Sequence, residues 1–117
     1  MSLIADYTIV SDAWVLQYDT DTVNFTVPSN IHTGSRTILG FMLHVDNQAD
    51  LTLKLNMNGS QIWSRTFESG DRIQFFQEVV TAGVVKPGKN VFTFKTTSDD
   101  YNLVELSDIV LWWQASI

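Results

Sequence analysis

The chain has 117 residues, a hydrophobic fraction of 44% and a formal net charge of −6. This length and composition are typical of a globular chain that buries its own core, so we expect one domain over residues 1–117. The 7 lysines and arginines are scattered, which argues against nucleic acid and against an anionic membrane surface as partners. The chain has no cysteine, which excludes disulfides, thiol catalysis and cysteine-based zinc sites.

No membrane or export signal is recognised in the sequence. No apolar run approaches the roughly 18 residues of a membrane-spanning helix, so we expect no transmembrane segment. Residues 1–10 lack the basic and apolar regions of a signal peptide. A cysteine-free chain suits the cytosol, a virion and a bacterial exterior equally well, so composition leaves the compartment open.

Apolar and polar residues alternate with a period of two in the first half of the chain, which predicts β-strands. Short strands are expected over residues 7–10 and 13–18. A third is expected over 23–27, where Pro28 ends it. The next strand, over 38–45, is apolar at both parities, so we expect a central strand that is covered on both faces, at least in part.

The middle of the chain predicts a hairpin. Residues 51–57 alternate between apolar and polar and are followed by Asn58-Gly59, the sequence that best tolerates the positive φ angles of a type I′ turn. The return strand is expected over 61–67, and a turn at 68–71 leads into a strand over 72–81.

The last third predicts two more strands. The Pro-Gly sequence within 86–90 favours a turn, and a strand is expected over 91–96. The closing strand is expected over 103–114 with a β-bulge near Ser107-Asp108, because the apolar parity switches there. With about eight to nine strands, the sequence predicts an all-β fold, an antiparallel β-sandwich of jelly-roll type.

Several of these segments resemble those of a known family. Residues 53–59 with Ile62-Trp63, residues 85–94 with their Pro-Gly-x-Asn turn, and residues 104–111 are similar to the hairpin, turn and last strand of carbohydrate-binding jelly-roll modules of the galactose-binding type. The resemblance covers residues 50–113. It implies a jelly roll and a carbohydrate partner, but the matching motifs describe turns and strands rather than a sugar site.

The closing strand ends in two adjacent tryptophans, Trp112 and Trp113. Successive side chains of a strand point to opposite faces, so only one of the two enters the core. The other must be covered by a loop, a partner chain or a ligand. Trp63 and Tyr101 are further candidates for an aromatic platform that stacks on a sugar ring, although aromatic residues also dominate sandwich cores.

Polar side chains on the predicted strands supply candidate partners for sugar hydroxyls. Gln74, Gln77 and Arg65 are expected on one wet sheet face, and each can pair with two hydroxyls at once. An ordinary solvated sheet face is the alternative explanation of these residues.

Oxygen donors in one predicted loop suggest a calcium site. Asp46, Asn47 and Asp50 place three such donors within five residues, and calcium takes oxygen ligands from loops of this kind. The spacing matches no EF-hand, and the same residues are common turn formers that bond their own backbone. Calcium therefore remains an expectation rather than a requirement.

No catalytic pattern is recognised in the chain. His32 and His44 are its only histidines, and neither a Ser-His-Asp arrangement nor a nucleophile elbow or phosphate-binding glycine loop is present. Carboxylate pairs for glycoside hydrolysis exist, but the sequence does not give their separation. We therefore expect a protein that is not an enzyme.

Two functions from different classes follow. The first is a non-catalytic carbohydrate-binding module or small lectin that uses an exposed tryptophan with neighbouring polar side chains. The alternative is a structural or assembly module, such as a virion or fibre component, in which the tryptophan is buried in a homo-oligomer. Either function favours an extracellular or virion-associated location.

Overall fold

The computed structural model describes residues 3–15, 20–96 and 103–116. These residues form eight β-strands and no helix, and accordingly none of them forms a helix that could cross a membrane. The strands are β1 (Leu3–Val15), β2 (Thr20–Val27), β3 (Thr37–Asn47), β4 (Leu51–Met57), β5 (Ser60–Phe67), β6 (Gly70–Val80), β7 (Gly88–Thr96) and β8 (Leu103–Ser116).

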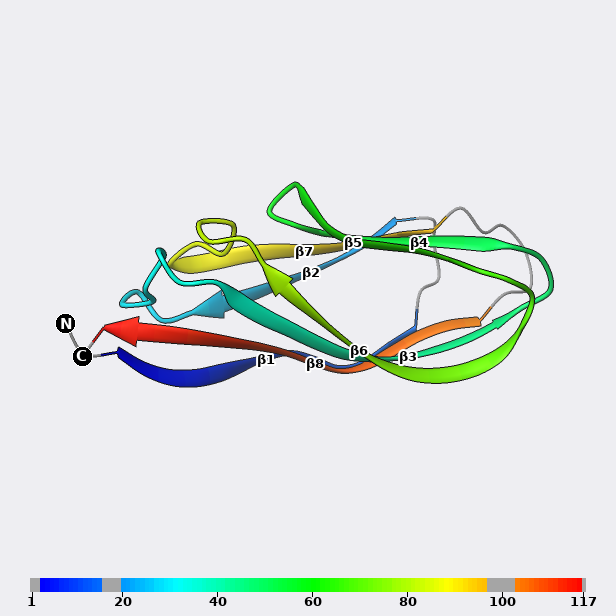
Figure 1. Cartoon of the computed structure of the whole chain (residues 1–117), viewed down its shortest axis with the longest axis horizontal. Helices are drawn as coiled ribbons and strands as arrows, with labels where there is room; N and C mark the ends of the chain where they lie inside the picture. Colours follow the sequence, from blue (N-terminus) through cyan, green and yellow to red (C-terminus); the bar gives the residue numbers. More distant parts are fainter. Residues whose placement is uncertain (1–2, 16–19, 97–102, 117) are drawn as a thin grey trace.

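The strands pair in two antiparallel four-stranded sheets that stack as a sandwich (Figure 1). The first sheet has the order β1-β8-β3-β6 and the second the order β2-β7-β4-β5. Neighbours in each sheet are mostly distant in sequence, as in a jelly roll. The expected all-β sandwich of jelly-roll type is confirmed, with eight strands. Residues 7–10 and 13–15 of the two segments expected as separate strands lie in one strand, β1, whose pairing with β8 is interrupted by a register shift between Ile9 and Ser11. Residues 16–18 of the second expected strand lie outside the described residues.

Two local predictions are confirmed by the backbone angles. Asn58 and Gly59 have φ angles of 52° and 85°, as a type I′ turn between β4 and β5 requires. Asp108 has a φ of 51°, and β3 pairs with β8 through a register shift between Gly40 and Met42 at this level. The closing strand therefore carries the expected bulge.

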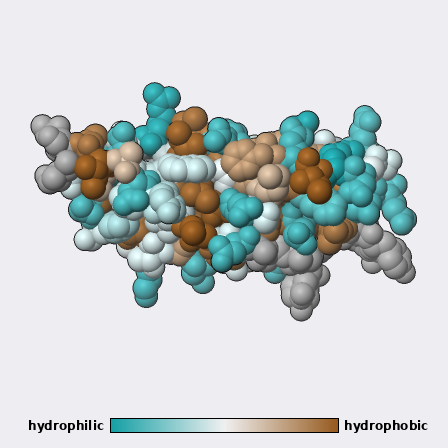
Figure 2. All heavy atoms as spheres, turned by 90° about the horizontal axis from the view of Figure 1, so that it is seen from below, coloured by the Kyte–Doolittle hydropathy of each residue, from teal (hydrophilic) through white to brown (hydrophobic). Residues whose placement is uncertain are grey.

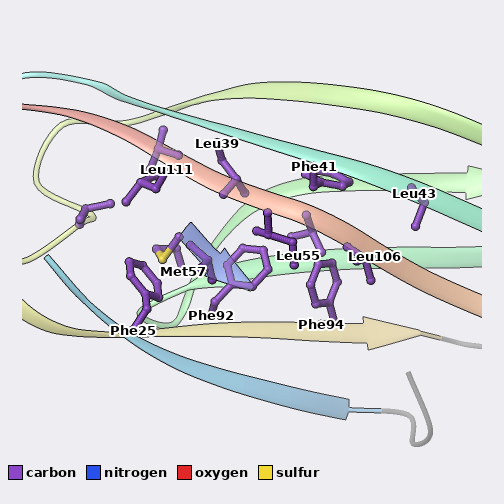
Figure 3. Packing of buried hydrophobic residues seen from close by; sticks show 14 of the residues in the cluster. Phe25, Leu39, Phe41, Leu43, Leu55, Met57, Phe92, Phe94, Leu106 and Leu111 are labelled. Carbon is purple, nitrogen blue, oxygen red and sulfur yellow. The ribbon is translucent and has the colours of Figure 1, made fainter. Parts of the chain in front are cut away.

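The core fills the space between the two sheets (Figure 3). The largest fully buried side chains include Phe41 of β3 and the neighbouring rings of Phe92 and Phe94 of β7, which meet edge to face with centroids 4.7 Å apart. Burying each such side chain contributes about 1.5–3 kcal/mol relative to leaving it in water. The bulge at Asp108 keeps β8 in this pattern, since Val104 and Leu106 precede it and Ile109 and Leu111 follow it on the same inner face.

Candidate functional site

The two adjacent tryptophans of β8 lie on opposite faces of the first sheet. Trp113 is buried, with only 6% of its surface exposed, and its Nε1 donates a hydrogen bond to Thr8 Oγ1 at 2.9 Å. Trp112 points away from the core on the outer face of the first sheet and is 37% exposed. The bulge at Asp108 decides this assignment, because it returns Ile109 and every second residue after it to the inner face.

Gly40 of β3 lies directly beneath the exposed indole of Trp112. A Cβ atom at Gly40 of β3 would lie only 2.7 Å from Trp112 Cζ3 and 2.9 Å from Phe75 Cζ. Both distances are shorter than a van der Waals contact allows. The missing side chain of Gly40 therefore lets the rings of Trp112 and Phe75 lie directly against the backbone of the sheet, which holds the indole in place.

A shallow, open pocket of about 400 Å³ adjoins Trp112. Its apolar part comes from the two tryptophans with Ala5 and Ile38, and its polar part comes from the loop before β3 and the end of β8. The lining residues are Ala5, Gly34, Ser35, Arg36, Ile38, Trp112, Trp113 and Gln114.

A hydrogen-bonded chain fixes the polar side of this pocket. The Ser35 hydroxyl donates to Gln114 Oε1 at 2.8 Å, and Ser35 Oγ lies 2.7 Å from His32 Nδ1. Because the hydroxyl has one proton, His32 Nδ1–H is the donor in the second bond. Gln114 adds two N–H donors on Nε2 and Arg36 adds five on its guanidinium. The pocket thus joins an aromatic face to several donors.

The loop before β3 is held against the end of β8 by its backbone. His32 N–H donates to Gln114 O at 2.8 Å, Ser116 N–H donates to Asn30 O at 3.1 Å, and Ile31 forms a bridge with Ala115. These bonds place Ser35 beside Gln114 across a separation of 79 residues. Ser35, Arg36 and Gln114 were missed as site residues by the sequence analysis, because no local pattern reports such a contact.

A second group of the expected site residues meets at the edge between β5 and β6. Arg65 and Gln74 line an open pocket of about 450 Å³ there, together with Arg72 and Glu68. The Arg65 guanidinium lies over two rings, 5.4 Å from the centroid of Phe67 and 5.3 Å from that of Phe76. Charged side chains that turn inward at an edge strand also discourage pairing with other chains, which accounts for these positions without a ligand.

Trp63 belongs to the aromatic cluster of this edge. Its ring centroid is 5.3 Å from that of Phe41 and 5.1 Å from that of Phe76, and the side chain is partly buried against the core. It therefore packs against the core rather than presenting a platform like that of Trp112.

The expectation that Gln74, Gln77 and Arg65 share one wet sheet face is wrong. Gln77 pairs with Gly40 and lies on the outer face of the first sheet, whereas Gln74 pairs with the buried Leu43 and faces inward. The two glutamines are three residues apart, and an odd spacing on a regular strand places side chains on opposite faces. Tyr101 lies outside the described residues.

Two of the residues expected to bind calcium, Asp46 and Asn47, point to opposite faces of β3. Asp46 is exposed and the adjacent Asn47 is 3% exposed, as expected for neighbours that point to opposite faces of β3. The Asn47 Nδ2 group donates to the backbone oxygens of Ala49, Phe67 and Glu68 at 2.8, 3.2 and 3.1 Å. Asn47 thus closes its loop as a donor, and no group of three carboxylate or imidazole residues suited to a metal occurs in the described parts of the chain.

We expect Asn47→Ala to lower the free energy of unfolding by about 1–2 kcal/mol. The substitution leaves three carbonyl groups without their donor, but it also removes Oδ1, which is buried and has no hydrogen-bond partner among the described residues. Urea unfolding measures the change. Asp50→Ala, an exposed site in the same loop, is the control and should shift stability by less than about 0.5 kcal/mol. If Asp50→Ala instead lowers the free energy of unfolding by more than this, and does so only when calcium is present, the result would support the expected calcium site.

Comparisons with known proteins identify the fold. No family model and no curated protein matches the chain. Among solved structures, the dimeric latent PorU of Porphyromonas gingivalis is similar over 99% of this chain and 13% of its own, with a TM-score of 0.77 and 12% identity. This chain therefore spans a small part of that protein.

Two further solved structures are similar to this chain over most of its length. The CBM36-1 domain of a multidomain xylanase, from the hindgut metagenome of Trinervitermes trinervoides, has a TM-score of 0.50 and 12% identity over 92% of this chain and 96% of its own. An exo-β-1,3-galactanase of Phanerochaete chrysosporium has a TM-score of 0.51 and 16% identity over 94% of this chain and 26% of its own. At these identities the likeness shows a jelly-roll fold shared with carbohydrate-binding modules.

Proposed function

We propose that the protein binds carbohydrate without catalysing a reaction, at the pocket beside Trp112. The observation that carries the proposal is an exposed indole, held over Gly40, next to a pocket with a polar rim. The apolar C–H face of a sugar ring would stack on Trp112. Its hydroxyls would pair with Arg36, Ser35 and Gln114.

The chemistry of the pocket suits a sugar better than a purely apolar ligand. A small-molecule site combines an apolar surface with a few placed polar groups that fix orientation, and a volume of about 400 Å³ lies in the usual range. The chain from His32 through Ser35 to Gln114 holds two of these polar groups before a ligand arrives. Less side-chain freedom is then lost on binding.

The lining of the pocket favours binding over hydrolysis. Glycoside hydrolysis uses a pair of carboxyl groups on either side of the scissile bond, about 5–10 Å apart. None of the described residues that line this pocket is an aspartate or a glutamate. The fold shared with carbohydrate-binding modules supports the same function.

A glycan array followed by calorimetry with the best ligand tests the proposal, each with calcium and with a chelator. We expect Trp112→Ala to weaken binding by about 2 kcal/mol, which is roughly thirtyfold in Kd, because a buried aromatic contact at the centre of a site is worth about this much. Arg36→Ala should weaken binding less, since solvent replaces part of what it donates.

Two other variants show whether the effect belongs to this pocket. Lys54→Ala removes an exposed positive charge from the second sheet and should leave Kd unchanged. Arg65→Ala reports on the pocket between β5 and β6. A loss of binding in Arg65→Ala with none in Trp112→Ala would place the ligand at that edge and overturn the proposed site. No glycan binding by the native chain would overturn the function.

A further inference from the structure

The middle of the outer face of the first sheet is mostly apolar across all four strands. One row of paired residues runs through Tyr7, Trp112, Ile38 and Val79, and the next through Ile9, Val110, Gly40 and Gln77; Met42 pairs with Phe75 beyond them. None of these residues is charged, and we call them the apolar rows. Figure 2 views the molecule from the side of β1 and β8 and shows apolar side chains interspersed with polar ones along this side.

Several large apolar side chains of this face are exposed to solvent. Ile73, two residues before Phe75 and on the same face, is 68% exposed, and Tyr7, Ile9 and Val79 are 54–56% exposed. The outer face of a solvated antiparallel sheet is normally polar. Contiguous exposed apolar surface of this kind marks an interaction site.

The two ends of the same face carry opposite charge. Arg36 lies at one end, beside Trp112 in the pocket. At the other end Glu105 pairs with His44, and Asp46 pairs with Asp71; the His44 imidazole and the Asp71 carboxylate are 2.7 Å apart. The face is therefore basic at one end, mostly apolar in the middle and acidic at the other end, and the exposed Asp108 of the β8 bulge lies between the apolar rows and the acidic end.

We propose that this face pairs with the same face of a second copy of the chain. The two-fold axis lies in the plane of the interface and across the strands. This rotation places the apolar rows of one copy on those of the other, and it brings Arg36 of each copy toward the acidic end of the other. A two-fold interface must be complementary to itself, and a face with this order of charges meets that condition in the antiparallel orientation.

The face is large enough for a stable dimer. The Cα atoms extend 51 Å along the long axis of the molecule and 21 Å in each direction across it, so one long side of the molecule covers at most about 1,000 Å². A standard interface buries about 800 Å² on each partner. Two sheets that pack face to face with strands nearly aligned also reproduce the usual geometry of sheet packing.

Trp112 belongs both to the dimer face and to the proposed sugar site. A second copy therefore covers the indole that a sugar would use, and a ligand that binds there favours the monomer by mass action. The pairing itself rests on the apolar rows and the charged ends alone. It is measured without sugar, so a failure of sugar binding leaves its test unaffected.

Sedimentation equilibrium from about 1 to 300 µM tests the pairing. We expect the native chain to reach a mass twice the 13.2 kDa of one chain. Ile73→Asp and Val79→Asp should each raise the dimer Kd at least tenfold, because each buries an unpaired carboxylate in the interface. Val91→Asp is the matched control: Val91 is 39% exposed on the second sheet, and its substitution should leave the dimer Kd unchanged.

The orientation is tested by exchanging charges. Arg36→Asp should weaken the dimer, and adding Asp46→Arg to that variant should restore it at least in part. A native chain that stays monomeric at 300 µM overturns the pairing, as does a dimer that Ile73→Asp and Val79→Asp leave intact. Weakening by Asp46→Arg in the Arg36→Asp background overturns the antiparallel orientation.

Discussion

Asn90→Ala should lower the free energy of unfolding by about 4 kcal/mol, the largest loss that we expect from removing any one polar side chain. Asn90 is 1% exposed and uses both ends of its amide. Its Oδ1 accepts from Lys86 N–H at 2.8 Å and from Asn58 Nδ2 at 2.7 Å, and its Nδ2 donates to Lys86 O and Gly88 O. Alanine leaves these four partners without the amide that they bond to.

The loss extends beyond the turn at Pro87-Gly88. Asn58, whose φ of 52° suits few residues besides asparagine, aspartate and glycine, also donates to Val84 O and accepts from Val91 N–H, each at 2.8 Å. Asn90 therefore joins the tip of the β4–β5 hairpin to the start of β7. Asn47 makes the informative contrast, because its buried Oδ1 lacks a partner and the net contribution of its amide is smaller.

Thermal and urea unfolding of Asn90→Ala check this expectation. A loss of about 4 kcal/mol corresponds to a fall in Tm of about 15 °C for a domain of this size. Asn24→Ala is the control, because Asn24 is exposed on β2 and should change stability by less than about 0.5 kcal/mol. A loss below about 1.5 kcal/mol in Asn90→Ala would show that solvent reaches the turn and replaces the amide.

The strands were predictable because their pattern is local. The alternation in residues 51–57 predicts β4 with the same bounds, since one face of this strand meets the core and the other meets polar surroundings. Asn58-Gly59 and the parity switch at Asp108 are equally local signals. Each of these signals can be recognised from a few consecutive residues.

The edge strands were harder, because polar residues occupy positions that face inward. Arg65 and Gln74 lie at such positions on β5 and β6, where solvent reaches the open side of the sandwich. A reader of the sequence assigns polar residues to the wet face and so places Gln74 with Gln77. Pairing with the buried Leu43 shows the opposite.

The sequence predicted the aromatic part of the candidate site but not its polar rim. Adjacent tryptophans require that one ring leave the core, which singled out Trp112 and Trp113 from the sequence alone. The polar rim came from a loop that precedes β3 and bonds to the end of β8, and such a long-range contact has no sequence period. Gly40 was also missed, because a glycine within a strand shows its purpose only when the ring above it is seen.

Gly40→Val should abolish most ligand binding while the sandwich stays folded. The new side chain occupies the seat of the indole, where even a Cβ atom lies 2.7 Å from Trp112 Cζ3. The ring is at the far end of a side chain on an open face, so it moves rather than unfolding the sheet, and valine is a better strand former than glycine. We expect Kd to rise by about twentyfold, which is about 1.8 kcal/mol, with a change in unfolding free energy below about 1 kcal/mol.

A double-mutant cycle separates the loss of the seat from a general disturbance. If Gly40 acts by holding the indole, Gly40→Val adds little to the loss already caused by Trp112→Ala, because the two changes remove one interaction. Calorimetry on the four proteins, at concentrations where the chain is monomeric, gives the coupling. Additive losses would mean that valine at position 40 acts on the pocket by another route, and an unchanged Kd in Gly40→Val would mean that the ligand binds without the held ring.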